Sequence, residues 1–416
     1  MSESIYVYID SYSSESPVLI GNLYADTLRG KEVFSFEYDM NWLSNSSSLI
    51  LDPDLQLFSG RQYTSGEKNL FGVFTDSCPD RWGRLLMRRR EAITAREQNR
   101  PPKKLMESDY LLGILDSARM GALRFKTQKD GPFLAEESSQ SVPVWTKLRD
   151  LEEAAINIDS DIPEDKREKD WLRILVNPGS SLGGARPKAT VKDTTGKLWI
   201  AKFPSRNDQI NTGAWEMVIH ELALRCGITV PEARCSALSE AGCTFMAKRF
   251  DRTADNRRIH FLSAMTVLGK TDGNNYSDGS SYLDIAYAIR EQGSRVKHDL
   301  TELYRRILFS IAVSNSDDHL RNHGFLFEPK GLYLSPMFDV NPDPDASGLS
   351  LNIDETDNSM DFDLAINTSK YFDITKDDAA AMVKQIRSQT ASWSYFAERF
   401  GISRKEIEMM SYCFKC

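Results

Sequence analysis

The segment Asn315-Ser-Asp317-Asp318-His319-Leu-Arg-Asn322, with Phe338-Asp339 further along, decides how this chain is interpreted. Between the two parts, short apolar runs at 325–327 (Phe-Leu-Phe) and 332–334 (Leu-Tyr-Leu) flank a Glu-Pro-Lys-Gly turn. This pattern predicts a β-hairpin, which returns the chain to the level at which it began. We therefore expect Asn322 and Asp339 to converge on one ion, because Mg²⁺ binds hard oxygen ligands.

The spacing within this segment indicates a reaction type. An Asp, four residues and then an Asn, here Asp317 and Asn322, is the pattern of kinase catalytic loops, where the Asp takes a hydroxyl proton and the Asn binds Mg²⁺. A second Asp after a Phe supplies the other metal contact in such enzymes. The pattern predicts phosphoryl transfer with ATP and Mg²⁺ as cofactors, Asp317 as catalytic base, and Asn322 and Asp339 as metal ligands. Asp318 remains a rival for the base, and His319 is expected to hold the loop or face the phosphates.

A nucleotide site is predicted upstream. The run Leu198-Trp-Ile-Ala-Lys202 places a lysine in an apolar strand, where burial of its charge is costly unless the charge is paired. ATP phosphates and a carboxylate on the next helix are suitable partners; Glu216 is the candidate, and Glu221 stays open as an alternative. The stretch Ser180-Ser-Leu-Gly-Gly184-Ala-Arg-Pro-Lys188 has small residues that let backbone N–H groups approach phosphates, and its basic residues add positive charge.

Composition argues against several classes of protein. A net charge of −8 argues against extended coating of nucleic acid. The chain has no uninterrupted apolar run of about 18 residues and no basic start typical of a secretory signal, so we expect neither a membrane span nor export. Six scattered cysteines fit the reduced thiols of a cytoplasmic protein. The lone pair Cys413-Phe-Lys-Cys416 is not expected to bind metal or act in redox chemistry.

Apolar periodicity predicts an α+β fold. Alternating or β-branched runs at 5–9, 18–24 and 33–38 predict strands, and residues 188–203 predict a hairpin with its turn at Asp193-Thr-Thr-Gly196. Helical spacing predicts helices near 80–95, 108–115, 146–156, 211–226 and 300–312, the last of which leads into the Asn315 segment. Ser403-Arg-Lys-Glu406 has the pattern of a capping box. Residues 126–142 are polar and are the best candidate for a linker.

Taken in this order, these segments resemble the HipA family of toxin serine/threonine kinases. The matching stretches are Ser181-Leu-Gly-Gly-Ala-Arg-Pro-Lys188, Trp199-Ile-Ala-Lys202, Trp215-Glu216, Lys248-Arg-Phe-Asp-Arg252, Ser316-Asp-Asp-His-Leu-Arg-Asn322 and Phe338-Asp339. Cys78-Pro-Asp-Arg-Trp-Gly and residues 111–123 match in the N-terminal part, so the resemblance covers nearly the whole chain. It implies a protein-kinase-like two-lobed body preceded by a small mixed α/β N-terminal subdomain. The expected parts are a HipA-type subdomain at 1–130, an N-lobe-like region with phosphate loop, lysine strand and hinge at 131–252, and a helical C-lobe with the catalytic loop at 253–416.

The resemblance also implies roles for individual residues. Those expected to bind ATP are Ser181, Leu182, Gly183, Gly184, Ala185, Lys188, Lys202, Glu216, Lys248, Phe250, Asp251 and His319. Lys248 and Phe250 would act through hinge backbone contacts to adenine. Ser181 stands where the family has an autophosphorylated serine, and its modification would eject the phosphate loop and switch the enzyme off. Ser180 beside it leaves the modified position open.

Partners follow from the same resemblance. Family members pair with a small helix-turn-helix antitoxin, HipB-like, that binds operator DNA, and this chain has no obvious helix-turn-helix of its own. The expected substrate is a protein of the translation machinery, such as an aminoacyl-tRNA synthetase. The arginine-rich run from Arg81 to Arg90 and the acidic stretch 354–363 are interpreted first as solvated surface. Two alternatives remain open: a kinase of the same fold that acts on a small molecule, and a non-catalytic nucleotide-binding co-repressor.

Overall fold

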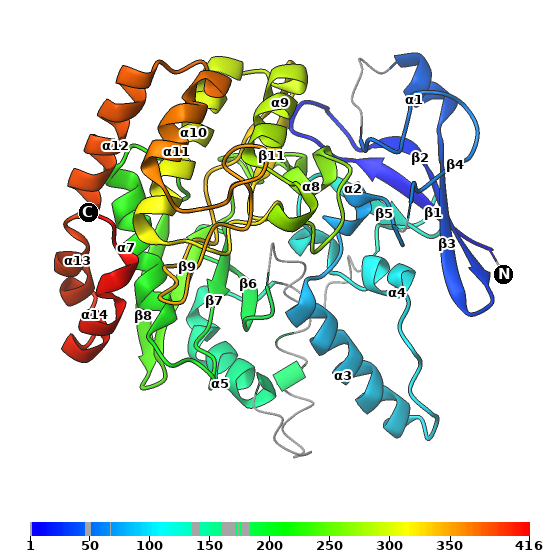
Figure 1. The fold of residues 1–416 in the computed structure, drawn as a ribbon. Helices are drawn as coiled ribbons and strands as arrows, with labels where there is room; N and C mark the ends of the chain where they lie inside the picture. The colour runs from blue at the N-terminus through cyan, green and yellow to red at the C-terminus, as the bar shows by residue number, and fades with distance from the viewer. Residues whose placement is uncertain are drawn as a thin grey trace. The chain divides into compact units, whose positions relative to one another are not determined.

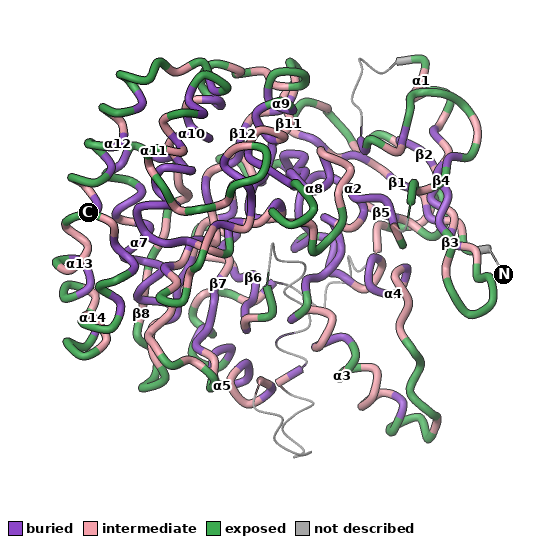
Figure 2. The backbone as a smooth tube through the Cα atoms, in the orientation of Figure 1, coloured by how far each residue is buried: buried purple, intermediate pink, exposed green. Residues whose placement is uncertain are grey.

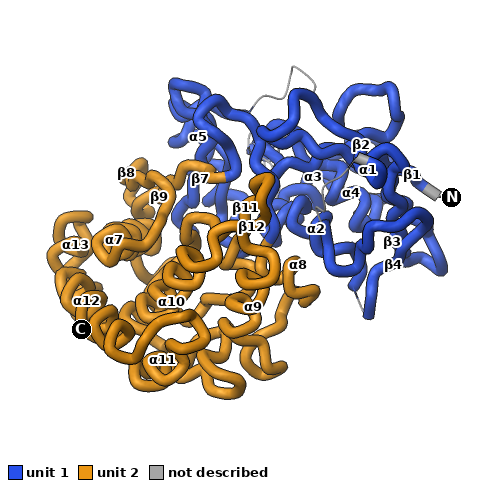
Figure 3. The backbone as a smooth tube through the Cα atoms, turned by 90° about the horizontal axis from the view of Figure 1, so that it is seen from above, with its two compact units in different colours: residues 1–206, 251–262 blue, residues 207–250, 263–416 orange. Residues whose placement is uncertain are grey.

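The computed structural model describes residues 2–45, 51–66, 68–134, 142–159, 171–172, 175 and 184–416 (Figure 1). Helices and antiparallel strands both occur along the described chain, so the predicted α+β class is confirmed. Buried and exposed stretches alternate along most elements (Figure 2), as amphipathic elements around a core require. The chain divides into two compact units, residues 1–206 with 251–262 and residues 207–250 with 263–416 (Figure 3). The three-part division at residues 130 and 252 stays a prediction.

Unit 1 begins with a five-stranded sheet in the order β4-β3-β2-β1-β5, in which every neighbouring pair is antiparallel. The three strands predicted in the first 40 residues are confirmed as β1, β2 and β3, with somewhat wider bounds. Side chains alternate along β1, where Ile5, Val7 and Ile9 are buried while Tyr6 and Tyr8 are half-exposed. The elements of unit 1 are β1 Ser2–Ile9, β2 Val18–Leu28, β3 Lys31–Tyr38, α1 Met40–Asn45, β4 Gln62–Tyr63, α2 Gly72–Thr75, α3 Arg81–Glu97, α4 Glu107–Leu112, β5 Leu123–Lys126, α5 Leu148–Asp159, β6 Lys188–Lys192 and β7 Leu198–Lys202, with short 3-10 turns at Asp116–Ala118 and Trp145–Lys147.

The predicted hairpin at 188–203 is confirmed by β6 and β7, which pair antiparallel. In its turn, Asp193 Oδ1 accepts from the backbone N–H of Thr195 at 2.8 Å, and Gly196 takes a φ of 82°. Lys188 and Lys202 lie directly opposite each other in this hairpin, so their side chains leave the same face. Both lysines are buried. Two buried cations on one face are unfavourable unless anions accompany them.

Unit 1 also holds a fully buried histidine, His260, whose ring nitrogens have no hydrogen-bond partner among the described residues. Burial lowers the pKa of His260 from 6.5 to about 4. The unfolded chain therefore binds a proton that the folded chain excludes. This difference costs nothing above pH 6.5, where His260 is neutral in both states. As the pH falls from 6.5 toward 4, it lowers the free energy of unfolding by about 3 kcal/mol in all.

We expect His260→Leu to remove this acid-dependent loss, because leucine fills a similar volume without a titrating group. The measurement is urea unfolding of the wild type and the variant at about pH 7.5 and about pH 4.5. If both proteins lose the same stability between these two pH values, His260 is not the source.

Unit 2 is mainly helical. Its elements are α7 Thr212–Arg225, β8 Ala233–Ser239, β9 Gly242–Lys248, α8 Ala264–Val267, α9 Tyr282–Gln292, α10 Val296–Val313, β11 Gly324–Glu328, β12 Gly331–Leu334, α11 Phe362–Thr368, α12 Lys376–Thr390, α13 Trp393–Arg399 and α14 Arg404–Met410, with 3-10 turns at Tyr276–Asp278, Ser369–Phe372 and Ser411–Cys413. The strand β10, Phe261–Ser263, lies where the chain passes from unit 1 to unit 2. Among the described helices, none is both long enough and apolar enough to cross a bilayer.

The helix α10 is buried along most of its length and confirms the apolar face predicted at 300–312 (Figure 2). Within it, Glu302 and Arg306 form a buried ion pair at 2.9 Å. Arg306 also donates to the carbonyl of Ser335, at 2.7 Å, and Glu302 accepts from the backbone N–H of Thr229, at 3.0 Å. These bonds tie α10 to the chain after β12 and to the chain after α7. The middle of α10 is therefore held against two other segments of unit 2.

The capping box predicted at Ser403 and Glu406 is only half right. Ser403 does cap α14, since its side chain accepts from the backbone N–H of Glu406. The Glu406 carboxylate instead accepts from the backbone N–H of Asn211 at 2.7 Å and from the Trp215 indole at 2.8 Å. The Trp215 side chain is fully buried, so its N–H needs an acceptor. That need explains why the carboxylate faces α7 rather than the start of its own helix.

Replacing Glu406 by Ala is expected to destabilise the protein by about 1–3 kcal/mol, because the buried Trp215 N–H would lose its acceptor. Glu406→Gln is the matched control, since its amide oxygen can still accept from the indole. Denaturant unfolding of both variants measures the difference. An alanine variant as stable as the glutamine variant would contradict this role for Glu406.

Candidate active site

The segment predicted to carry the chemistry follows α10 directly. Ser314, at the C-cap of α10, has a φ of 51°, and its N–H donates to the carbonyl of Ser310. A left-handed conformation at a residue other than glycine persists only where the surroundings impose it. Here the Ser316 hydroxyl donates to the carboxylate of Asp343, and the Ser350 hydroxyl donates to the Ser316 carbonyl at 2.7 Å. The turn after α10 is therefore firmly held.

Asp317 presents its carboxylate to solvent from this turn, with 81% of its side-chain surface exposed. The protein around the loop partly desolvates this carboxyl, and the carboxylates of Asp339, Asp318 and Asp343 repel its charge. Together these effects raise the pKa of Asp317, although the nearby His319 acts to lower it. His319 Nε2 lies 3.9 Å from Asp317 Oδ1. Asp317 is thus an accessible carboxylate whose affinity for protons is increased, as a general base requires.

Asp318, the rival for the base, is buried. Its carboxylate accepts from the hydroxyls of Tyr282 at 2.7 Å and Ser310 at 3.1 Å, and it lies 3.0 Å from His323 Nε2. Burial alone would raise the pKa of Asp318, but the His323 imidazole and the two hydroxyls lower it below its ordinary value. Through these contacts the Asp318 carboxylate holds the loop in place. Of the two neighbouring carboxylates, Asp317 is the exposed one.

Asn322 lies in the same loop and is buried. Its side-chain N–H donates to the Asp317 carbonyl at 2.8 Å, and its backbone N–H donates to the His319 carbonyl at 2.8 Å. Its Oδ1 is buried and has no hydrogen-bond partner among the described residues. A buried amide oxygen left in this state is costly, and a cation would satisfy it. The free oxygen of Asn322 therefore fits its predicted role as a Mg²⁺ ligand.

Asp339 follows the hairpin of β11 and β12, which confirms the predicted strand pair. It has a φ of 58°, again left-handed at a residue other than glycine. Its carboxylate is near enough to raise the pKa of Asp317, so the hairpin brings Asp339 back toward the catalytic loop as expected. The preceding Phe338 packs on Phe250 with ring centroids 5.4 Å apart. The predicted hinge residue Phe250 and the Phe-Asp pair therefore meet within unit 2.

The predicted phosphate contacts of unit 1 lie on the β6–β7 hairpin. The Lys188 ammonium pairs with the carboxylate of Asp80 at 2.9 Å, and both side chains are buried. Asp80 also accepts from the backbone N–H of Gly83 and so caps α3. Gly184 has a φ of 83°, and a Cβ there would stand 3.4 Å from the Lys188 ammonium. Lys188 is thus anchored close to the glycine turn, and Lys202 lies opposite it.

The remaining predicted nucleotide residues differ in their settings. Glu216 is buried on α7. Lys248 forms an exposed ion pair with Glu232 at 3.2 Å, so its side chain points to the surface. This position is compatible with binding adenine through the Lys248 backbone, as the sequence predicts. Asp251 is fully buried and accepts from the Gly121 N–H at 2.8 Å and from Arg252 at 2.5 Å. These two bonds support a structural role for the Asp251 carboxylate.

Ala185 is exposed beside Gly184, whereas four predicted residues, Ser180, Ser181, Leu182 and Gly183, lie outside the described residues. Sequence reasoning gave no role to Asp80, His323 or Tyr282. Asp80 belongs to the quoted Cys78-Pro-Asp motif, which was a usable signal. His323 directly follows Asn322, but nothing in the sequence reveals that it faces Asp318.

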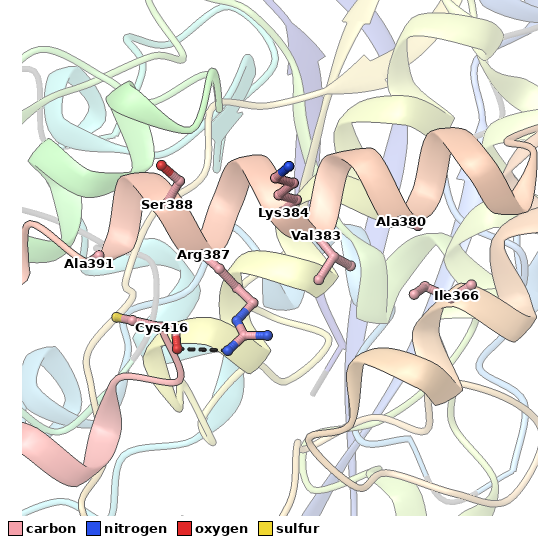
Figure 4. Close-up of a pocket in the computed structure, with 8 residues that line it drawn as sticks. All are labelled: Ile366, Ala380, Val383, Lys384, Arg387, Ser388, Ala391 and Cys416. Atoms are coloured by element: carbon pink, nitrogen blue, oxygen red, sulfur yellow. Dashed lines mark hydrogen bonds between the residues drawn. The ribbon is translucent and has the colours of Figure 1, made fainter.

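Within the described residues, no group of three or more His, Cys, Asp or Glu side chains is placed to hold a metal ion. Mg²⁺ commonly keeps several waters and takes one or two carboxylates plus phosphate oxygens, so the pair Asn322 and Asp339 is compatible with that finding. A separate pocket of about 530 Å³ lies beside α12 (Figure 4). Its lining is Ile366, Ala380, Val383, Lys384, Arg387, Ser388, Ala391 and Cys416, and Arg387 donates to the Cys416 carbonyl at 2.8 Å. The lining includes none of the candidate residues.

Known proteins share the family and the fold of this chain. The model of the HipA-like C-terminal domain family matches residues 180–394, which include the β6–β7 and β11–β12 hairpins and the predicted catalytic loop. The chain belongs to this family. A solved structure of HipA from Shewanella oneidensis MR-1, in a complex with HipB and operator DNA, matches with a TM-score of 0.67 and 17% identity, over 98% of this chain and 94% of that one. At this identity the likeness establishes the fold, and the predicted HipA-type fold is confirmed.

Relatives with more similar sequences match over shorter stretches. A protein of Sinorhizobium fredii named "Putative kinase Y4dM" is 28% identical over 158 residues, which is 35% of this chain and 37% of that protein. A "Putative kinase" of Haemophilus influenzae is 31% identical over 112 residues, 24% of this chain and 32% of that protein. The match therefore spans about a third of the length of these relatives.

Proposed function

We propose that this HipA-like chain is an ATP- and Mg²⁺-dependent kinase that phosphorylates serine or threonine in proteins and acts as the toxin of a toxin–antitoxin pair. One observation carries the proposal. At the end of a buried helix, an accessible carboxylate with a raised pKa, Asp317, stands beside the unused buried oxygen of Asn322. Phosphoryl transfer needs little more than a base, a metal contact and fixed positive charge.

In this proposal Asp317 accepts the proton of the acceptor hydroxyl as that oxygen attacks the γ-phosphorus, the bond from the γ-phosphorus to the β,γ-bridging oxygen breaks, and ADP leaves. Asn322 Oδ1 and the Asp339 carboxylate would hold Mg²⁺, which neutralises charge on the β- and γ-phosphates when bound. Lys202 and Glu216 would each act at the phosphates, and the Gly183-Gly184 loop would cover them. Lys188, which pairs with Asp80 and lies close to Gly184, would also act at the phosphates. The backbone of Lys248 and Phe250 contacts adenine, and His319 holds the loop or faces the phosphates.

Regulation in this proposal acts through the phosphate loop. Autophosphorylation of Ser181 or Ser180 would place a doubly charged group among the phosphate-binding residues and displace the loop. The modified chain would then be inactive. Phosphopeptide mapping of the chain after incubation with ATP identifies which of the two serines carries the phosphate.

The proposed partners follow from family membership. The similar HipA structure was solved with HipB and operator DNA, and we propose a separate HipB-like helix-turn-helix antitoxin for this chain, with operator DNA bound mainly through it. The proposed substrate is a component of translation such as an aminoacyl-tRNA synthetase, and the proposed place of action is the cytoplasm, where that machinery and ATP occur.

Labelled ATP tests the reaction type. The full chain is incubated with [γ-³²P]ATP, Mg²⁺ and a bacterial extract, and label is followed on proteins by gel electrophoresis and on metabolites by thin-layer chromatography. The proposal predicts label on serine or threonine of protein. Label confined to small molecules, or ATP binding without any transfer, would contradict it.

Asn322→Ala is expected to raise the Mg²⁺ concentration needed for half-maximal activity at least ~10-fold, since even partners in the outer shell of metal ligands have effects of this size. Asn322→Asp is the matched control, because it keeps an oxygen ligand while losing the N–H that donates to Asp317. A titration of activity with Mg²⁺ measures both. If the alanine variant keeps the wild-type Mg²⁺ dependence, Asn322 is not a ligand.

A further inference from the structure

Two cysteines face each other on the hairpin of β8 and β9 in unit 2. In its register Cys235 lies opposite Phe245, and Ala237 lies opposite Cys243. Residues directly opposite share a face, as do residues two apart on one strand. Cys235 and Cys243 therefore lie on the same face as diagonal neighbours on adjacent strands. A register shift between Ala237 and Ser239 adds local twist to this end of the hairpin.

The Cys243 thiol is close enough to the Cys235 thiol to raise the pKa of Cys235, and burial of Cys235 raises it further. Both side chains are partly accessible, whereas Cys78, Cys226 and Cys413 are buried. Among the described cysteines, this pair therefore combines a neighbouring thiol with access for a small reagent.

We propose that Cys235 and Cys243 form a reversible disulfide when a hydroperoxide oxidises them. Cys243 releases its proton and its thiolate attacks one peroxide oxygen. The O–O bond breaks, the Cys243 sulfur becomes a sulfenic acid, and the other oxygen takes up the released proton and leaves as water from hydrogen peroxide or as an alcohol from an alkyl hydroperoxide. The Cys235 sulfur then attacks the sulfenic sulfur, the S–S bond forms, and the hydroxyl leaves as water with the Cys235 proton. Two thiols lose two electrons in total, and the peroxide gains them.

A hydrogen bond of Cys235 decides the order of the two steps. The Cys235 thiol donates its proton to the Gly213 carbonyl oxygen, 3.7 Å from the sulfur, so Cys235 is the less readily ionised of the two thiols. Cys243 is therefore the thiol that reacts first, and Cys235 resolves the sulfenic acid.

The proposed bond would press on the first turn of α7. The backbone N–H of Cys243 donates to the Asn211 side chain at 2.9 Å, and a Cβ on Gly213 would stand only 1.9 Å from the Cys243 carbonyl oxygen. Glu216, one turn further, is near enough to affect the charge state of Cys235. Diagonal neighbours on adjacent strands stand farther apart than the Cα separation that a disulfide prefers, so a bond of about 2.05 Å between the sulfurs must draw these strands together. A strained and partly accessible disulfide is readily reduced, so the site is reversible.

Mass spectrometry tests this directly, because trypsin cleaves after Arg234 and Lys248 and so leaves both cysteines in one peptide, 235–248. The reduced full chain is treated with hydrogen peroxide, alkylated and digested. We expect this peptide to lose two hydrogens and to resist alkylation, and dithiothreitol to reverse both changes. Cys416→Ser, which removes an exposed thiol elsewhere, is the background for all variants.

Two variants test the order of attack. In Cys235→Ser, the Cys243 sulfenic acid has no resolving partner and should be trapped by dimedone, while Cys235 in Cys243→Ser should remain alkylatable. The proposal is overturned if peptide 235–248 stays fully alkylatable after peroxide, or if its cysteines gain only oxygen. This readout does not depend on kinase activity, so its result is independent of the proposed function.

Discussion

Asp317→Asn is expected to lower the rate of phosphate transfer ~10²- to 10⁴-fold, the usual contribution of a general base. Asparagine has the same shape as aspartate but cannot take a proton from the acceptor hydroxyl. The fold should not suffer, because 81% of the Asp317 side-chain surface is exposed and its main carboxylate neighbours repel it. Transfer of label from [γ-³²P]ATP measures the rate, and thermal unfolding measures the fold.

The pH dependence of the phosphate-transfer rate of the wild type tests the same role of Asp317. A base acts only when it is deprotonated, so the rate should fall as the pH falls through the pKa of Asp317, which lies above its ordinary value of 3.8. In the asparagine variant this acid limb should disappear from the residual rate. Undiminished transfer by Asp317→Asn would remove Asp317 from the base role.

Asp318→Ala is expected to destabilise the protein by about 3–5 kcal/mol, the cost of removing one member of a buried charged network. The change would leave the hydroxyls of Tyr282 and Ser310 and the imidazole of His323 without their shared acceptor. Denaturant unfolding, compared with that of Asp317→Ala, measures the difference between these adjacent residues.

The two variants should therefore show opposite profiles. Asp317→Ala should keep its stability and lose its activity, whereas Asp318→Ala should lose stability first. A stable, inactive Asp318→Ala protein beside an active Asp317→Ala protein would reverse the assignment.

Several features could be predicted from the sequence because their signal is local. The spacing of apolar residues predicts α10, and the turn at 328–331 predicts the hairpin that carries Asp339. The Asp-to-Asn spacing predicts the catalytic loop. Sequence could not choose between Asp317 and Asp318, since the choice depends on Tyr282 and Ser310, which reach the loop only in the folded chain.

Other features depend on contacts between distant parts of the chain. The pairing of Lys188 with Asp80 joins residues that are 108 positions apart, and no local pattern indicates it. Glu406 fits a capping box by sequence, yet the buried indole of Trp215, from 191 positions away, takes its carboxylate. No sequence pattern indicates that Cys235 and Cys243 form a pair, because only the register of the hairpin makes the two thiols neighbours.

The most direct test is a crystal structure of the full chain with a non-hydrolysable ATP analogue and Mg²⁺. We expect one nucleotide whose metal is bound by Asn322 Oδ1 and the Asp339 carboxylate, with Lys202 on its phosphates and Asp317 facing the γ-phosphate. A nucleotide bound elsewhere, or these four side chains dispersed around no common ligand, would contradict it.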